Sequence, residues 1–213
     1  MIVQIKNVTK TFMGAHSLDN VNLTFHAGDK VAIMGANGAG KTTLVRAMMG
    51  YYHVAQGTVQ VNGYDPVKNR VHVLNETSFI PQLPPPIKIS CEELITFTVK
   101  SAKCDESLIY AYAARMGLDL SLHVKKSFFK LSGGMKQKLL IAIALAKKSK
   151  LMIFDEPTAN LDPDGRAMFY EMLGEVDKET TMIFISHRLD EIEHLVNRLV
   201  YMDLGKVMRD EMV

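Results

Sequence analysis

The octet GANGAGKT, at residues 35–42, constrains the fold of this chain more than any other segment. It follows the apolar run Val31–Met34 and opens a helical pattern over Lys41–Met49, with Gly50 where a left-handed helix cap is expected. The apolar residues of that pattern fall on one face: Leu44, Val45, Met48 and Met49. Because the octet matches the G-x-x-x-x-G-K-[ST] pattern, the sequence predicts a strand, a phosphate-binding loop and a helix in succession.

The residue types of this loop have distinct expected roles. Its glycines let backbone N–H groups turn toward phosphate oxygens at a helix N-terminus, which favours an anion. Lys41 is expected to reach the β- and γ-phosphates of a nucleotide, and the Thr42 hydroxyl is expected to bind Mg²⁺. The alternative is an ordinary glycine-rich turn. The expected nucleotide contacts are Gly35, Ala36, Asn37, Gly38, Ala39, Gly40, Lys41, Thr42 and Thr43.

The hydrophobic patterns predict an α/β fold. Three short segments are apolar without alternation: Val31–Met34, Leu151–Phe154 and Met182–Ile185. Such strands are typical of a parallel sheet that helices cover on both faces. Three other segments alternate and are separated by turn signals: Ile2–Val8, Val21–Phe25 and Thr58–Val61. The expected fold is a P-loop NTPase core with a mostly parallel sheet, a flanking antiparallel β layer and a small inserted helical subdomain.

The inserted segment lies between Gln82 and Ser132. It opens with Pro84–Pro86, which exclude a helix there, and helical patterns follow. Asp105 is a candidate N-cap of a helix that ends before Gly117. The stripe of that helix consists of Leu108, Ile109, Tyr112, Ala113 and Met116. We expect one domain over residues 1–213, with the core and β layer at 1–82 and 131–213 and the helical subdomain at about 83–130.

The segment LMIFDE, at residues 151–156, ends in two carboxylates. Its apolar run predicts a central strand, so Asp155 is expected at the carboxyl end of a sheet, where α/β folds bind ligands. Asp155 is a candidate ligand of Mg²⁺, and Glu156 a candidate to polarise the water that attacks a phosphate. An Asp-Glu pair at a helix N-terminus is the alternative.

The octet LSGGMKQK, at residues 131–138, predicts a second anion site. A serine hydroxyl and two glycines stand at the start of a helical stretch, where backbone N–H groups lack partners. The buried face of this helix is expected to consist of Leu139, Leu140, Ile143 and Ala144. We call residues 131–138 the signature octet.

Composition and charge indicate an ordinary folded, soluble domain. Of 213 residues, 47% are hydrophobic and 23% charged, and the net charge of +2 is too small to indicate nucleic-acid binding. Cys91 and Cys104 are expected to be reduced structural thiols, because neither lies at metal-ligand spacing. We expect a cytoplasmic protein, since no stretch reaches the roughly 18–20 apolar residues needed to span a bilayer.

The order of the motifs resembles that of the ATP-binding subunit of an ATP-binding-cassette (ABC) transporter along essentially the whole chain. The shared features follow in sequence: GANGAGKT, Gln82 after Phe79-Ile80-Pro81, LSGGMKQK, LMIFDE, the turn Ala159–Asp162, and His187 after an apolar strand. The resemblance implies ATP hydrolysis with Mg²⁺. It also implies a head-to-tail dimer, in which each ATP lies between the phosphate loop of one subunit and the signature octet of the other.

Several residue roles follow from the resemblance alone. Ser132, Gly133 and Gly134 would contact the ATP of the partner subunit. Gln82 would contact Mg²⁺ and the attacking water, and His187 the γ-phosphate. Asp162 would belong to a turn that communicates across the dimer, and Phe12 would stack on adenine. Three of these residues have a simpler alternative role. His187 would be a structural histidine, Asp162 a helix N-cap and Phe12 a core aromatic.

Two features depart from the usual family pattern. Met135 stands where the signature octet most often has glutamine, so one polar contact with the partner's nucleotide is expected to be lost. Pro84–Pro86 follow Gln82, where the family contacts its membrane subunit, and are expected to reshape that groove.

The resemblance implies an energy-coupling subunit, most simply a homodimer, at the cytoplasmic face of the membrane on separately encoded permease subunits. The compact form is similar to cassettes of exporters for copper and nitrous-oxide-reductase maturation, or for cytochrome maturation. One alternative is a soluble ABC ATPase associated with DNA or ribosomes, although the single cassette, short insert and low charge do not favour it. The other is a degenerate regulatory cassette, against which Lys41, Asp155, Glu156 and His187 argue.

Overall fold

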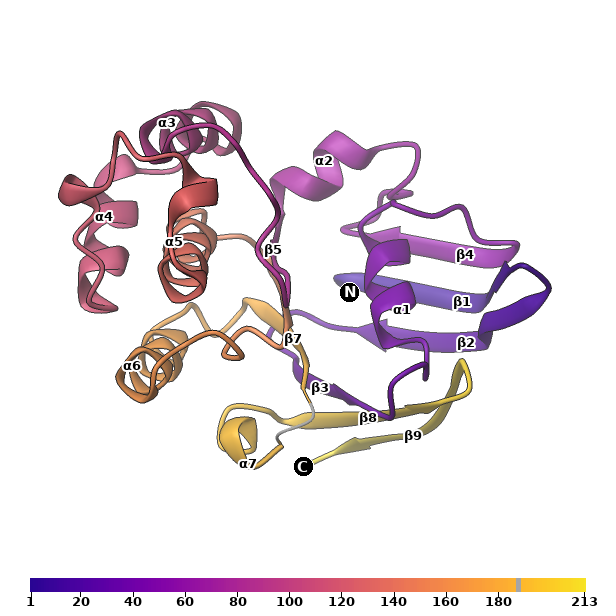
Figure 1. The fold of residues 1–213 in the computed structure, drawn as a ribbon. Helices are drawn as coiled ribbons and strands as arrows, with labels where there is room; N and C mark the ends of the chain where they lie inside the picture. The colour runs from indigo at the N-terminus through magenta and orange to yellow at the C-terminus, as the bar shows by residue number, and fades with distance from the viewer. Residues whose placement is uncertain (187–188) are drawn as a thin grey trace. The chain divides into compact units, whose positions relative to one another are not determined.

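The computed structural model describes residues 1–186 and 189–213, which divide into two compact units (Figure 1). The first unit consists of Met1–Thr77, Lys150–Asp155 and Lys178–Val213. The second unit consists of Ser78–Ser149 and Glu156–Asp177. Both therefore contain segments that are distant in the sequence.

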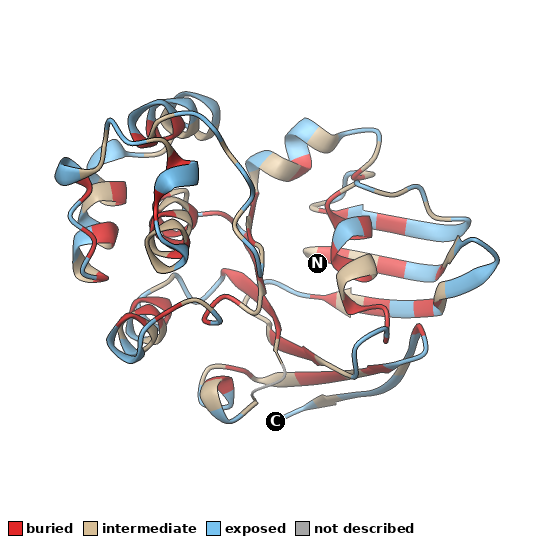
Figure 2. Cartoon of the chain, in the orientation of Figure 1, coloured by how far each residue is buried: buried red, intermediate tan, exposed pale blue. Residues whose placement is uncertain are grey.

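The first unit is built around a mostly parallel sheet. Its strands are β3 (Lys30–Met34), β6 (Leu151–Asp155), β7 (Thr181–Ile185), β8 (Arg198–Asp203) and β9 (Lys206–Met212), in the order β6-β7-β3-β8-β9. Strands β6, β7, β3 and β8 pair in parallel, and β9 pairs antiparallel with β8. The three continuous apolar segments form β3, β6 and β7, and their residues are buried except the half-buried Met34 (Figure 2). The prediction of a parallel α/β sheet is confirmed.

A separate antiparallel sheet also lies in the first unit. It contains β1 (Val3–Phe12), β2 (Ala15–Phe25) and β4 (Gln56–Val61), in the order β2-β1-β4. Buried and exposed residues follow one another along these strands (Figure 2), as the sequence pattern predicted. The first two strands are longer than predicted, because register shifts between Ile5 and Thr11 interrupt the alternation while the strands continue.

Shorter elements complete the first unit. Helix α1 (Lys41–Met48) ends before Gly50, whose φ of 71° is left-handed as predicted. Helices α2 (Arg70–Asn75) and α7 (Leu189–Ile192) are brief, and strand β5 (Thr77–Ile80) runs across the unit boundary.

The second unit is helical. It contains α3 (Cys91–Ala102), α4 (Glu106–Arg115), α5 (Gly133–Ala146) and α6 (Pro163–Gly174), with single 3-10 turns at Leu120–Leu122 and Phe128–Lys130. Helix α4 begins as predicted, since the Asp105 carboxylate accepts a hydrogen bond from the Ser107 amide. Residues 84–86 are not helical, in agreement with the three prolines. Buried side chains from α3, α4 and α5 form one core with Phe128.

The prediction of one buried face on α5 was wrong. Leu139 and Ala144 are buried as expected, but Leu140 and Ile143 are only partly buried. The other buried residues of the helix are Gln137, Ile141, Ala142, Leu145 and Ala146. Buried residues occur around the whole circumference of this helix, so its sequence period could not define a single face.

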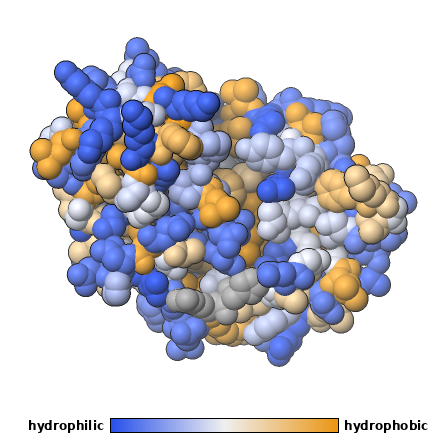
Figure 3. Space-filling view, in the orientation of Figure 1, coloured by the Kyte–Doolittle hydropathy of each residue, from blue (hydrophilic) through white to orange (hydrophobic). Residues whose placement is uncertain are grey.

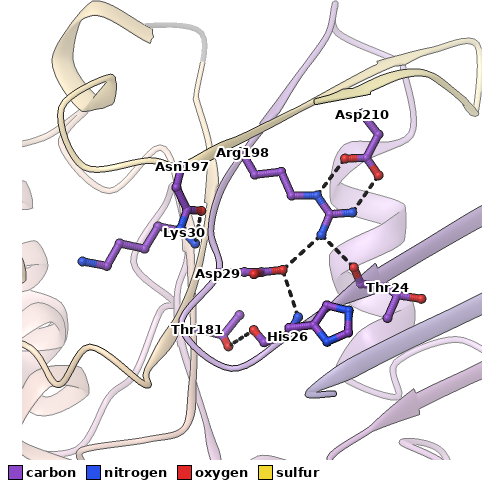
Figure 4. Close-up of polar contacts among 8 residues, drawn as sticks. All are labelled: Thr24, His26, Asp29, Lys30, Thr181, Asn197, Arg198 and Asp210. Atoms are coloured by element: carbon purple, nitrogen blue, oxygen red, sulfur yellow. Dashed lines mark hydrogen bonds and ion pairs between the residues drawn. The ribbon is translucent and has the colours of Figure 1, made fainter. Parts of the chain in front are cut away.

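Arg198 at the start of β8 joins several segments of the first unit (Figure 4). Its Nε and Nη2 atoms each donate to the Asp210 carboxylate at 2.7 Å. Its Nη1 donates to the Thr24 carbonyl at 2.8 Å and to Asp29 Oδ2 at 3.0 Å. The hydrogen bond with Asp210 raises the pKa of Arg198 above its usual range. The guanidinium therefore connects the β8–β9 hairpin with the end of β2 and the turn before β3.

Replacement of Arg198 by Met is expected to lower the free energy of unfolding by about 2–3 kcal/mol, because two poorly exposed carboxylates lose their cation. Urea unfolding followed by circular dichroism measures this change. The matched control is Arg209→Met, which removes a 59% exposed side chain paired with Glu211 and is expected to cost about 0.5–1 kcal/mol. Equal losses in the two variants would contradict a special role of Arg198.

Candidate nucleotide-binding site

The phosphate loop connects β3 to α1 in the first unit, as predicted. Its glycines have positive φ angles, of 86° at Gly38 and 100° at Gly40. Gly40 is the N-cap of α1, so the loop delivers its last residues into the first turn of a helix. Unpaired amides and the helix dipole make this turn attractive to an anion.

Lys41 folds back over the loop that precedes it. Its Nζ atom donates to the Gly35 carbonyl at 2.6 Å and to the Ala36 carbonyl at 2.9 Å. The residue is 6% exposed, so these carbonyls compensate for the loss of water around the ammonium group. The positive charge is thereby held at the loop.

Oxygen ligands for Mg²⁺ are present in the first unit. Thr42 lies in the first turn of α1, and the half-buried Asp155 ends β6. Residues 1–186 and 189–213 contain no cluster of three or more His, Cys, Asp or Glu that could hold a metal ion. A hydroxyl and a carboxylate nevertheless fit Mg²⁺, which binds proteins through one or two side chains and takes its other ligands from phosphates and water.

Phe12 ends β1 and is 40% exposed, which excludes the alternative of a core aromatic. Tyr52 contacts its ring edge to face, with 5.1 Å between the ring centroids, and Lys10 Nζ lies 4.9 Å from the Phe12 centroid. The exposed ring is compatible with stacking on a base, which stays a prediction. The sequence carried no signal for Tyr52, because it is brought to Phe12 from a distant loop.

Glu156 and Gln82 meet in the second unit. Gln82 Nε2 donates to Glu156 Oε2 at 2.6 Å, and the Gln82 carbonyl accepts a hydrogen bond from Asn160 Nδ2 at 3.2 Å. Glu156 has a φ of 46°, a left-handed conformation that a non-glycine residue rarely adopts. Gln82 and Glu156, which were both predicted to contact the attacking water, are thus in direct contact. The hydrogen bond from Asn160 to Gln82 was not predicted.

The signature octet begins helix α5, as predicted. Ser132 is the N-cap, and its Oγ accepts a hydrogen bond from the Met135 amide at 3.2 Å. Ser132 and Gly133 are exposed, whereas a Cβ at Gly134 would lie 3.1 Å from the Asn160 carbonyl oxygen. The Met135 side chain packs against the helical core of its own unit. This packing gives a structural reason for an apolar residue at that position.

Asp162 occupies the N-cap position of α6, but its side chain makes no capping hydrogen bond. Asp162 Oδ1 instead pairs with Lys138 Nζ at 3.0 Å, and the Lys138 side chain is only 14% exposed. This hydrogen bond lowers the pKa of Asp162. The last residue of the signature octet is therefore tied to the turn Ala159–Asp162, a contact that the sequence did not indicate.

The candidate site residues fall into both units. The first unit holds Phe12, the phosphate loop and Asp155, and the second holds Gln82, Ser132–Gly134 and Glu156. The boundary between the units falls between Asp155 and Glu156. His187 lies outside the described residues.

Comparison with known proteins identifies the family. The family model of the ABC transporter matches residues 18–159. The glutamine transport ATP-binding protein GlnQ of Escherichia coli K12 is 32% identical over 221 residues, which cover 98% of this chain and 90% of GlnQ. The human glucosylceramide transporter ABCA12 is 31% identical over 209 residues, which cover 95% of this chain but only 8% of ABCA12.

The fold agrees with this result. The solved structure of an ATP-binding subunit of an ABC transporter superposes with a TM-score of 0.90 at 22% identity, covering all of this chain and 90% of the other. The predicted α/β fold, with a mostly parallel sheet and a separate antiparallel β layer, is confirmed by this likeness. The chain belongs to the ABC transporter family, as an ATP-binding subunit that hydrolyses ATP to drive transport.

Proposed function

We propose that this chain pairs head to tail with a second ABC subunit, most simply a copy of itself, around two MgATP. The observation that carries the proposal is the presence of two helix starts suited to phosphate in one chain. Gly40 and Lys41 begin α1 in the first unit, and the exposed Ser132 and Gly133 begin α5 in the second. Each ATP contacts only one of these two helix starts in a given subunit. The other helix start is therefore left for the ATP that a partner subunit binds.

The side chains then divide the work of hydrolysis. Lys41 binds the β- and γ-phosphates, while Thr42 and Asp155 would hold Mg²⁺, which would neutralise charge on the phosphates. Glu156 orients and polarises the attacking water, assisted by Gln82 through the hydrogen bond between their side chains. Phe12 stacks on adenine, and His187 contacts the γ-phosphate.

We further propose that the dimer docks on separately encoded permease subunits at the cytoplasmic face of the membrane. In the part of the chain that the structure describes, no helix is long and apolar enough to cross a membrane. On the face shown in Figure 3, hydrophilic residues predominate and apolar residues form separate patches. The exporter assignment stays a prediction, and identification of a copurifying permease tests it.

The dimer is tested with Glu156→Gln, which keeps the shape of the side chain but removes the carboxylate that activates water. This variant is expected to elute as a dimer in ATP and as a monomer without nucleotide. Size-exclusion chromatography with light scattering measures the change. A variant that stays monomeric at about 100 μM in saturating ATP, far above the roughly 1 μM Kd expected of a weak specific dimer, would contradict the proposal.

A second substitution tests which surface meets the partner's ATP. In the Glu156→Gln background, Ser132→Asp is expected to weaken the ATP-dependent dimer about tenfold or more, because it places a carboxylate near the partner's phosphates. Ser132→Asn is the matched control, since Asp and Asn are both good N-caps of similar shape. Equal dimer affinities of these two variants would mean that the signature octet does not lie near the partner's phosphates. That result would overturn the head-to-tail arrangement.

A further inference from the structure

Gln137 is a polar side chain with no exposure to solvent, although it lies on the helix that begins with the signature octet. It belongs to α5 and is 0% exposed. Its Nε2 atom donates to the carbonyl oxygen of Pro157 at 2.9 Å. Pro157 directly follows Glu156, so this bond joins α5 to the segment that carries the candidate catalytic carboxylate.

The other end of the Gln137 amide argues against a purely stabilising role. The Pro157 carbonyl can only accept, so the amide nitrogen faces it and Oε1 points elsewhere. Among the residues that the structure describes, Gln137 Oε1 has no hydrogen-bond partner. A buried acceptor without a partner opposes folding, and an apolar side chain of similar size would avoid that cost. Selection for stability alone does not explain a glutamine here.

The backbone beside this bond is strained. Glu156 has a left-handed φ of 46°, and the Glu156 carbonyl accepts a hydrogen bond from the Ala159 amide at 3.2 Å in the turn that follows. Such a conformation persists only where neighbouring contacts fix it. The bond from Gln137 holds the Pro157 peptide, while the bond from Gln82 holds the Glu156 carboxylate. The peptide that follows Pro157 and the side chain of Glu156 are thus each held by a glutamine.

We propose that Gln137 is a positioning residue for ATP hydrolysis, which fixes the backbone of Glu156 through the Pro157 carbonyl and so sets where the Glu156 carboxylate meets the attacking water. This inference rests on the proposed role of Glu156. It also gives α5 a direct connection to hydrolysis: the helix whose first turn faces the partner's ATP holds the carboxylate of its own subunit in place.

The test uses Gln137→Met, which keeps the length of the side chain and removes both amide groups. Its kcat for ATP is expected to fall about tenfold or more, with KM and the Kd for ATP within twofold of the unaltered chain. Its Tm is expected to stay within about 3 °C, because the orphaned acceptor disappears together with the hydrogen bond. The matched control is Leu145→Ala on the same helix, a buried position where Tm falls and kcat is retained.

The pH dependence of kcat in a conservative variant distinguishes a positioning role from a purely structural one. In Gln137→Glu, burial raises the pKa of the new carboxyl, and its protonated form can donate to the Pro157 carbonyl. The kcat of this variant relative to the unaltered chain is therefore expected to rise as the pH falls from about 8.5 to 6.5, while the corresponding ratio for Gln137→Met stays flat. Tm is measured at each pH to follow folding.

The outcomes separate this inference from the function on which it rests. If Glu156→Gln hydrolyses ATP at the unaltered rate, the proposed role of Glu156 fails. If Glu156→Gln is inactive while Gln137→Met keeps full kcat, only the positioning role is overturned. The positioning role is also overturned if Leu145→Ala, at an equal loss of Tm, loses as much kcat as Gln137→Met.

Discussion

Replacement of Lys41 by Met is expected to lower kcat/KM for ATP hydrolysis by about 1,000-fold or more and to weaken ATP binding by about tenfold or more. The reason is the position of the ammonium group, which the Gly35 and Ala36 carbonyls hold within the phosphate loop. A poorly hydrated charge acts strongly on the phosphates, and it acts most where charge develops in the transition state. Release of inorganic phosphate measures the rate, and fluorescence of a labelled nucleotide measures binding.

Two further measurements separate this effect from damage to the loop. Lys41→Arg keeps the charge on a differently shaped group, so it is expected to bind ATP more tightly than Lys41→Met while it still hydrolyses poorly. Unfolding of both variants without nucleotide reports the contribution of the two loop hydrogen bonds. If Lys41→Met hydrolyses ATP within tenfold of the rate of the unaltered chain, Lys41 does not act on the phosphates.

The central sheet and the phosphate loop could be predicted because their signals are local. Val31–Met34 is apolar on both faces, the loop pattern follows it directly, and Gly50 marks the end of the helix. The Asp105 N-cap was likewise predictable, since its partner Ser107 is two residues away. Each of these features is determined by neighbours in the sequence.

Contacts between distant segments could not be read in this way. Asp162 was a reasonable candidate for an N-cap, but its carboxylate forms an ion pair with Lys138 from another helix. Phe12 was placed near a nucleotide without any indication that Tyr52 supports its ring. Gln137 belongs to an octet rich in polar residues, and its full burial could not be read from that pattern. Tertiary packing, which no single-sequence pattern encodes, decides all three.

Replacement of Gly40 by Ala is expected to lower the free energy of unfolding by about 3–5 kcal/mol, the second large effect in this chain. Gly40 has a φ of 100°, and a Cβ there would collide with the Ser17 carbonyl oxygen and lie 3.2 Å from Leu18 Cδ2. Because the obstacle is the backbone of β2, it cannot be relieved by a rotamer change. The variant is measured by urea unfolding without nucleotide.

Gly38→Ala isolates the two components of this cost. Gly38 has a similar φ of 86°, but within the described residues nothing lies within 4 Å of a Cβ built there. Its substitution is therefore expected to cost only the strain of the left-handed conformation, about 1–2 kcal/mol. The difference between the two variants measures how closely the phosphate loop packs on β2. Equal losses would mean that the loop moves away from Ser17 freely, and that Gly40 serves only the backbone conformation at the start of α1.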